Sequence, residues 1–395
     1  MSKHNLRFVL FAVLIGLLSC AHVQRDGQRA FTFIVTADMR YAATEEYRYP
    51  WYFLGVCEAI REVGKGAFMV SPGDVDPPQS VREMLTQVFG ADYLWYPVMG
   101  NHELEAASNV EYLRQYNKGG ASLPNIVRKG PAGCEETTYS FDWGNTHFVV
   151  LNQYYDGSSD MGTDGDVVPE LLAWLEADLA ANTKKQIIVF GHEPIIAVPD
   201  IDNGRLRHQG DSLDKYPENA FNFHRLLLKY GVTAYIHGHT HSASFSKLNG
   251  LWQIDAGHCR GMETDPPEQL LLWLAEAIEE GRQRGQTEDQ SIREFFNSRV
   301  SIVKKALEYM ELSGGLSSKE LSDEQAFKAF SQFYLESQKD STTRNQYFQS
   351  FWESYPYSKS TFLKFYVDSK GAKVEIYRDR DRGRQYFLRH TEILD

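Results

Sequence analysis

The sequence predicts an α/β fold, and three observations lead to that prediction. Five short apolar stretches, each typical of a buried strand, end in a polar residue of a type that binds metals, in four cases directly after a glycine. Helical patterns lie between several of these stretches, which is the order of strand–helix–strand units in a parallel sheet. Later the chain becomes helical and then returns to strand patterns. We therefore expect one α/β domain that is interrupted late by a helical insertion.

The first part of the chain supplies three of these strands. Strands are expected at 31–35, 67–70 and 95–99, with helices at 52–63 and 81–89. The polar residues that follow the strands are Asp38, Asp74 and Asn101. Because strand ends in open α/β sheets are where ligands bind, these residues are expected to lie together.

The middle of the chain continues the pattern after a hairpin. Residues 137–152 predict two antiparallel strands with a turn at Gly144, and 169–179 predict an amphipathic helix. A strand at 186–190 leads to His192. A helix at 223–230 and a strand at 233–236 then lead to His239 and His241, and 252–257 predict one more short strand.

The last third changes character twice. Helices are expected at 269–280, 292–310 and 324–337, and Ser322 with Gln325 resembles a capping box for the third. Strands at 361–367 and 372–377 form a predicted hairpin, and 386–388 could add a strand. The expected organisation is a signal peptide at 1–19, a tether at 20–30, a core at 31–265, a helical insertion at 266–356 and core-completing strands at 357–395.

The N-terminus predicts export. Lys3 and Arg7 precede an apolar run from Phe8 to Leu18 that is short for a membrane span, and the run ends at Ser19-Cys20. This arrangement resembles a bacterial lipoprotein signal, which implies lipid attachment at Cys20. An ordinary secretory signal or an N-terminal anchor are the alternatives. We expect an exported protein of the bacterial cell envelope, at the outer membrane or facing the periplasm, with the lipid as its only membrane attachment.

Composition narrows the possible partners. Forty-one basic and 53 acidic residues give a net charge of −12, which argues against a nucleic-acid-binding surface. Hydrophobic residues make up 42% of the chain, enough for a packed core. If Cys20 is lipidated, three cysteines remain, so at most one disulfide can form, for example between Cys134 and Cys259. The oligomeric state stays open.

The collected polar residues suit a metal centre that acts on phosphate. Carboxylate, amide and imidazole ligands favour hard or borderline cations, and a shared carboxylate holds two cations about 3.5–4 Å apart. The ordered blocks Gly73-Asp74, Gly100-Asn101-His102-Glu103, Gly191-His192 and Gly238-His239-Thr240-His241 resemble the calcineurin-like metallophosphoesterase family. The resemblance covers about 31–257 and implies a four-layer αββα sandwich.

The resemblance also implies a role for each matching residue. Asp74 would bridge two ions of the Mn, Fe or Zn class. Asn101, His192 and His239 would complete one site, and Asp38 and His241 would belong to the other. His102 would protonate the leaving group or orient the phosphate, with Glu103 holding its ring. The substrate would be a phosphorylated small molecule or ester.

Arg40 departs from the family pattern, which has a histidine ligand at that position. Arginine offers no lone pair to a metal, so one site loses a ligand. Asp76 or Tyr41 could replace it, water could fill the position, or the site could be weak with Arg40 on the phosphate. We expect water or a substitute ligand, with Arg40 near the phosphate.

A polar stretch after His192 is expected to overhang the site. Its Arg205, Arg207 and His208 are candidates for substrate binding, against the alternative of a solvated loop. His147, His224 and His390 are expected to be structural. His237 and His258 flank the motifs, but the pattern supports no ligand role for them.

The leading hypothesis is therefore a lipid-anchored enzyme that hydrolyses a phosphate mono- or diester by metal-bound hydroxide. The alternative is a surface binding protein that keeps the fold but has lost catalysis, with Arg40 as the trace of that loss. A third possibility is an enzyme for another bond, such as a pyrophosphate.

Overall fold

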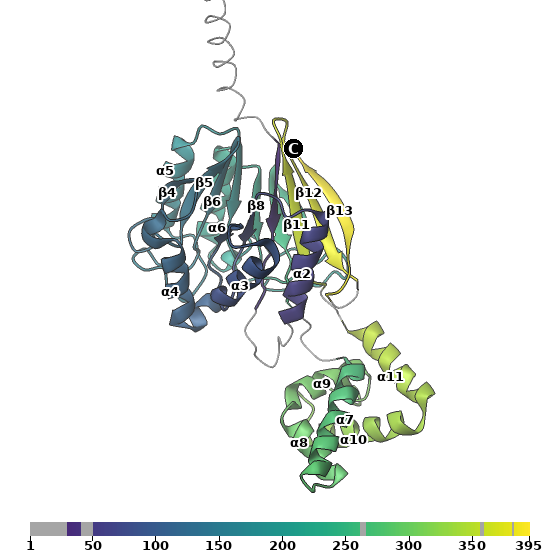
Figure 1. Ribbon diagram of the computed structural model, residues 1–395. Helices are drawn as coiled ribbons and strands as arrows, with labels where there is room; N and C mark the ends of the chain where they lie inside the picture. The colour runs from purple at the N-terminus through teal and green to yellow at the C-terminus, as the bar shows by residue number, and fades with distance from the viewer. Residues whose placement is uncertain (1–29, 41–49, 261–265, 356–358, 381–382) are drawn as a thin grey trace, which may run out of the picture. The chain divides into compact units, whose positions relative to one another are not determined.

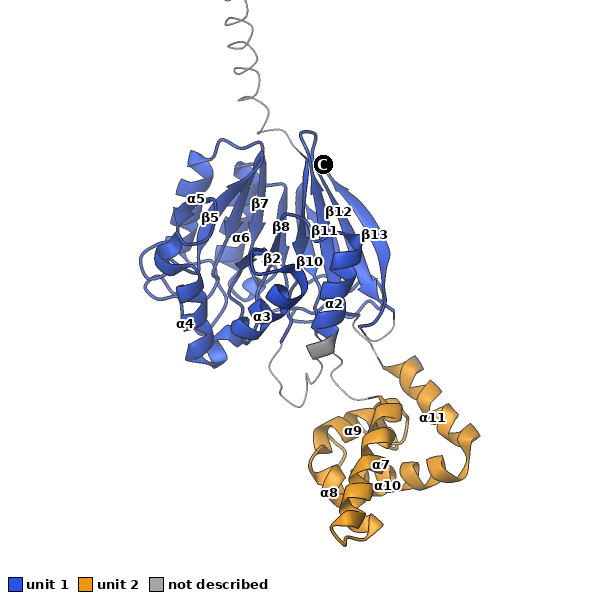
Figure 2. Cartoon of the chain, viewed as in Figure 1, with its two compact units in different colours: residues 1–41, 49–260, 359–395 blue, residues 42–48, 261–358 orange. Residues whose placement is uncertain are grey.

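The computed structural model describes residues 30–40, 50–260, 266–355, 359–380 and 383–395 (Figure 1). The predicted signal peptide, Cys20, most of the tether and Tyr41 lie outside these residues. None of the helices within them combines the length and apolar character needed to cross a membrane. The described chain forms two units, the first built from 30–40, 50–260 and 359–395 and the second from 266–355 (Figure 2).

The first unit contains two mixed sheets. The six-stranded sheet has the order β13–β12–β11–β1–β2–β3, in which β1, β2 and β3 are parallel and β11 runs antiparallel to β1. Its strands are β1 Phe31–Val35, β2 Phe68–Ser71, β3 Leu94–Pro97, β11 Thr361–Val367, β12 Ala372–Asp379 and β13 Tyr386–Leu394.

The seven-stranded sheet has the order β4–β5–β6–β7–β8–β10–β9. Its centre, from β6 to β10, is parallel, and the hairpins at its two edges are antiparallel. Its strands are β4 Ile126–Lys129, β5 Tyr139–Trp143, β6 Thr146–Val150, β7 Gln186–Phe190, β8 Ala234–His237, β9 Ala243–Leu248 and β10 Leu251–Ala256. The predicted hairpin around Gly144 is β5–β6.

Successive side chains of a strand point to opposite faces of its sheet, so the apolar residues are divided among three hydrophobic cores: one between the sheets and one on the outer face of each sheet. Phe33 faces the space between the sheets, where its ring stacks on Phe365 at 4.6 Å and meets Phe148 edge-on at 5.3 Å. Its neighbour Ile34 points outward and packs with Val56 under the first pair of helices. These helices are α2 Pro50–Val63 and α3 Pro78–Phe89.

The outer face of the second sheet is covered in the same way. Val149 and Val189 pack with Leu175 and Phe223. The covering helices are α5 Pro169–Ala181 and α6 Pro217–Lys229, and α4 Ala107–Tyr116 follows β3 after a short 3-10 turn. Helices, sheet, sheet and helices form the predicted αββα sandwich, which is thereby confirmed.

Helices are the regular secondary structure of the second unit within its described residues. It contains α7 Pro267–Gln283, α8 Glu288–Asn297, α9 Val300–Tyr309, α10 Asp323–Lys339 and α11 Ser341–Ser354. The capping box of Ser322 with Gln325 is present. The prediction of one helix over 292–310 was wrong, because the helix ends at Asn297 and Arg299, with extended φ, starts the next one.

The insertion leaves and re-enters the first unit at neighbouring points. The Thr361 amide donates to the His258 carbonyl at 2.7 Å, and the Cys259 thiol donates to the Thr361 carbonyl at 3.0 Å. Cys259 and Cys134 are both buried and free, in the cores outside different sheets, so the disulfide that the sequence left open is not formed.

Candidate metal centre

The candidate centre lies where the carboxyl ends of β1, β2, β7 and β8 meet. Asp38, Asp74, His239 and His241 all adopt left-handed φ values, of 51°, 54°, 70° and 58°. Such values are uncommon for residues with a Cβ and tend to occur at functional sites. Here the sharp turns direct side chains from separate loops toward one point.

Glycines beside these residues allow the loops to approach one another. A Cβ on Gly73 would lie 2.2 Å from Nδ1 of His192, and one on Gly100 would lie 2.3 Å from Oδ1 of Asp74. Neither distance is possible without displacing a candidate ligand. This close approach explains the glycine that precedes the polar residue in the sequence motifs.

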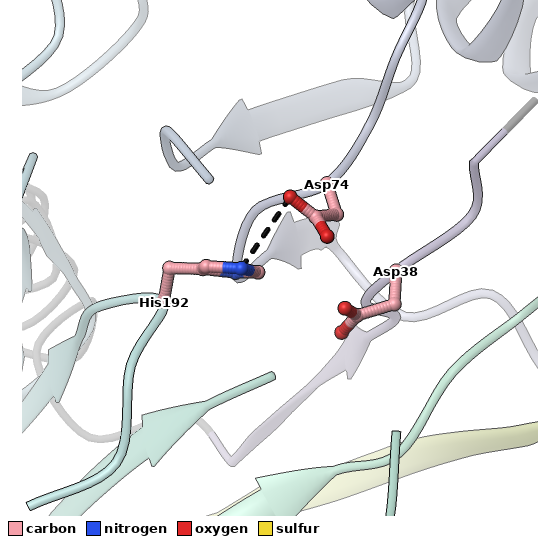
Figure 3. A group of neighbouring side chains, drawn as sticks. All are labelled: Asp38, Asp74 and His192. Carbon is pink, nitrogen blue, oxygen red and sulfur yellow. Dashed lines mark ion pairs between the residues drawn. The ribbon is translucent and has the colours of Figure 1, made fainter. Parts of the chain in front are cut away.

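The first group of candidate ligands is Asp74, Asn101, His192 and His239. Nε2 of His192 lies 3.4 Å from Oδ1 of Asp74, 3.1 Å from Oδ1 of Asn101 and 3.2 Å from Nδ1 of His239. Nδ1 of His239 is in turn 3.2 Å from Oδ1 of Asn101. Asp38 lies beside them, and Figure 3 shows its carboxylate and that of Asp74 facing the His192 ring.

The contacts around this group leave lone pairs directed at its centre. Nδ1 of His192 faces the Pro72 carbonyl oxygen at 2.8 Å and must donate to it, so Nε2 points inward without a proton. Two imidazole nitrogens, an amide oxygen and a carboxylate oxygen therefore converge. A cation satisfies such a set, and the chemistry of the donors fits the metal class that the sequence predicts.

The second group contains Asp38 and His241. Nε2 of His241 is 3.2 Å from Oδ1 of Asp38, and the backbone N–H of His239 donates to both oxygens of that carboxylate at 3.2 and 3.0 Å. The other ring nitrogen of His241 faces two guanidinium groups, those of Arg207 and of the buried Arg260, the latter at 2.6 Å.

Electrostatics distinguishes the two aspartates. Burial raises the pKa of Asp38 well above its ordinary value, and the neighbouring Asp74 and Asp255 raise it further, while Arg260 acts in the opposite direction. Burial would also raise the pKa of Asp74, but interactions with His192 and His102 outweigh burial and leave that pKa lowered. Two buried carboxylates this close favour a nearby positive charge.

Glu103 does not hold the His102 ring, which corrects the prediction. Its carboxylate accepts backbone N–H bonds from Gly100 at 2.5 Å, Asp74 at 3.1 Å and Val75 at 2.7 Å. It therefore joins two ligand loops. Glu105 takes the expected role, because its Oε1 lies 2.5 Å from Nδ1 of His102.

His102 itself borders the first ligand group. Its Nε2 is 3.7 Å from Oδ2 of Asp74, and 24% of its side chain is exposed. It is therefore both close to the centre and accessible to a substrate.

Arg40 is held by acidic neighbours. Its Nε lies 3.3 Å from Oδ1 of Asp76 and its Nη2 lies 3.5 Å from Oε2 of Glu105, with the side chain almost fully buried. Asp76, one expected substitute ligand, is thus engaged by the arginine. Burial raises the pKa of Asp76 to about 7 even though Arg40 acts to lower it.

The polar loop after β7 reaches the site through Arg207 and His208. Arg207 contacts His241, and the His208 ring lies 4.2 Å from that of His239. Arg205 instead uses its backbone carbonyl, which accepts from the Asp200 amide at 3.0 Å. Asp200 fixes the loop, because its Oδ2 is 2.8 Å from the guanidinium of the buried Arg378.

Support residues that the sequence did not indicate hold the histidine loop. The Thr240 hydroxyl donates to Asp255 at 2.5 Å, and the same carboxylate lies 3.6 Å from Nδ1 of His237. Burial lowers the pKa of His237 to about 3. Thr240 lies inside the motif, but Asp255 and Arg260 follow it without a recognisable spacing.

Three histidines expected to be structural make local contacts. His147 lies between Asp142 and Asp178, at 2.8 and 2.9 Å. His224 is 3.0 Å from the Leu248 carbonyl, and His390 is 3.2 Å from Glu392.

The fold and this centre define the class of protein, and comparison with known families agrees. Residues 22–243, more than half of the chain, match the sequence profile described as calcineurin-like phosphoesterase. The chain belongs to the calcineurin-like phosphoesterase family, and the predicted class, a phosphoesterase among the hydrolases, is confirmed.

Individual relatives are distant. Tartrate-resistant acid phosphatase type 5 of Rattus norvegicus is 26% identical over 168 residues, which are 41% of this chain and 48% of that protein. The chain thus matches about half the length of this relative. Among solved structures, PhoD is 11% identical with a TM-score of 0.45, covering 92% of this chain and 69% of that one. GAP50, the anchor in the inner membrane complex of Plasmodium, is 16% identical with a TM-score of 0.36, covering 58% and 71%.

Proposed function

We propose that this protein hydrolyses a phosphate mono- or diester with a metal ion held by Asp74, Asn101, His192 and His239. The observation that supports this proposal most directly is the convergence of lone pairs in that group, with His192 fixed by the Pro72 carbonyl. Such an ion would neutralise phosphoryl oxygens and lower the pKa of bound water.

The protein's own residues supply the remaining functions. His102 is accessible beside Asp74 and is oriented by Glu105, so it can give a proton to the departing oxygen of the ester. Arg207 lies on a loop at the edge of the site and can attract the anionic substrate. The buried Glu103 holds the loops of Asp74 and Asn101 in register.

Activity on two simple substrates tests the proposal. Protein lacking residues 1–19 and supplied with Mn, Zn or Fe is expected to release nitrophenol from nitrophenyl phosphate or from bis-nitrophenyl phosphate, and EDTA should abolish the release. Asp74→Asn should lower kcat by about 10³-fold or more, because it removes a charged ligand. Asp92→Asn, at an exposed position, is the matched control and should keep full activity.

The two substrates also separate the alternatives. Preference for one of them assigns the mono- or diester class. If neither substrate reacts with any of the three metals, the proposal fails and the binding-protein alternative gains support.

We further propose that Cys20 anchors the protein to the cell envelope through a lipid. The support is the basic start, the short apolar run and the cysteine that follows it. The full chain expressed in a diderm bacterium should take up labelled palmitate and sediment with the outer membrane. Cys20→Ala should lose the label. A wild-type protein that is exported but unlabelled would indicate an ordinary secretory signal instead.

A further inference from the structure

The two halves of the candidate centre differ in the hydrogen-bonding character of the atoms that meet there. In the first half, Nε2 of His192 and Oδ1 of Asn101 are both acceptors and face each other at 3.1 Å, and Nδ1 of His239 lies 3.2 Å from each of them. A cation is the simplest group that makes this arrangement favourable.

In the second half, hydrogen-bond donors face the ring of His241, the expected metal ligand. Nδ1 of His241 faces Nη2 of Arg260 at 2.6 Å and also Nη1 of Arg207. A guanidinium group can donate hydrogen bonds but cannot accept them. Nδ1 of His241 must therefore be the acceptor and carry no proton.

This contact determines the form of the whole ring. A neutral imidazole with an unprotonated Nδ1 has its proton on Nε2. Nε2 of His241 points at Oδ1 of Asp38, 3.2 Å away, and donates its proton there. A protonated nitrogen has no lone pair in the ring plane, so in this form His241 cannot bind a metal with the atom that faces Asp38.

The charge of the second half is also balanced without an ion. Asp38 accepts from the His239 amide and from His241, and the buried guanidinium of Arg260 lies on the other side of the His241 ring. Arg40 stands where the family pattern has a histidine ligand, and it is held by Asp76 and Glu105. A cation added to the second half would be repelled by the buried guanidinium groups of Arg40 and Arg260. It would also have one ligand fewer than in the family pattern, because arginine replaces a histidine.

We infer that this protein binds one metal ion, at Asp74, Asn101, His192 and His239, and that Arg260 and His241 occupy the second site of the family with protein groups. The guanidinium of Arg260 supplies positive charge there and holds His241 in its Nε2–H form. Arg260 is in this sense a positioning residue. The inference rests on the metal centre of the proposed function and differs from the expectation of two ions.

Metal stoichiometry tests the inference directly. Protein containing all residues from 20 onward is incubated with excess Mn²⁺, separated from free ion by gel filtration and measured by elemental analysis. One ion per chain is expected. Two ions would overturn the inference while leaving the proposed function intact, and no bound ion would overturn both.

Electron paramagnetic resonance of the Mn²⁺-loaded wild-type protein provides a second measurement that needs no variant. A single isolated ion gives six hyperfine lines, and this pattern is expected. Two ions sharing Asp74 would lie about 3.5–4 Å apart and couple magnetically. A coupled multiline spectrum would therefore overturn the inference.

Paired histidine variants assign the site. His192→Ala should lose the ion, whereas His241→Ala should keep about one ion per chain, with folding checked by circular dichroism. Loss of the ion from a folded His241→Ala protein would contradict the inference. Nitrogen-15 NMR of the Zn²⁺-loaded wild type, assigned by the signal missing from His241→Gln, should show the Nε2–H form of His241. The Nδ1–H form would also contradict it.

Discussion

Two glutamates in one motif perform different tasks, and their hydrogen bonds show which. Glu103 is fully buried and accepts three backbone N–H bonds, so it stabilises the loops that present Asp74 and Asn101. Glu105 is largely exposed and contacts both the His102 ring and Arg40. The first glutamate holds the ligand loops together, and the second orients the His102 ring.

This difference predicts that two matched substitutions affect different properties, one the catalytic rate and the other the stability. Glu105→Gln should lower kcat roughly 10- to 100-fold, with KM, metal content and unfolding free energy nearly unchanged, because it loosens the orientation of His102. Glu103→Gln should lower the unfolding free energy by about 2–4 kcal/mol, because an amide oxygen cannot accept the three bonds as a carboxylate does. Steady-state kinetics and urea unfolding measure the two effects. An unchanged kcat in Glu105→Gln would show that His102 does not depend on Glu105.

Sequence reasoning at this scale succeeds where a residue lies in a motif and fails where it does not. The ligand candidates Asp74, Asn101 and His192 follow strands in recognisable blocks. Arg260 follows the short strand after the histidine motif with nothing in the sequence to mark it, and its contact with His241 is visible only in the structure. The role of Glu105 also depends on the 3-10 turn His102–Glu105. In such a turn, residues three apart lie on the same side, so Glu105 comes next to His102.

Elements with strong apolar periodicity were predictable, and elements with weak patterns were not. β1, β7 and α5 match their predicted ranges closely because their residues are apolar at the right spacing. β9 was missed, since Ala243–Leu248 is half polar. α11 lies inside the predicted helical insertion but was not predicted as a separate helix, since Ser341–Ser354 is rich in Ser, Thr, Asn and Gln. The second sheet was not anticipated from spacing either, because strand order depends on contacts distant in sequence.

The pairing of strands explains why the candidate ligands meet although they are far apart in the chain. β1 pairs with β2, and β7 pairs with β8, each in parallel register. The two sheets face each other across the core of Phe33 and Phe148, so their carboxyl ends open on the same side. The order of the motifs was visible in the sequence, but the distances between them follow from sheet register.

At the scale of the whole molecule, the helical unit is an insertion whose two ends join the first unit at neighbouring points. Its two ends leave β10 and enter β11, where the Thr361 amide bonds to the His258 carbonyl. No strand pairing recorded for the described residues links the insertion to either sheet. The first unit therefore contains its own cores and the candidate metal centre.

Excision of the insertion tests this independence. Replacing residues 261–358 with a short Gly-Ser linker should leave a folded protein that binds metal with the wild-type stoichiometry, because the joined ends already lie side by side. Circular dichroism, thermal unfolding and elemental analysis measure the outcome. Aggregation or loss of the ion would show that the helical unit contributes to the folded state or to the centre of the first unit.

The position of β1 has a consequence for how the protein is made. The strand that leads to Asp38 lies between β2 and β11, yet β11 comes more than 300 residues later in the chain. During synthesis β1 thus has an open edge until residues 361–367 emerge, after the whole helical unit. Removal of residues 361–395 would then leave β1, the strand that leads to Asp38, with one unpaired edge, so we expect such a truncation to destabilise this side of the site.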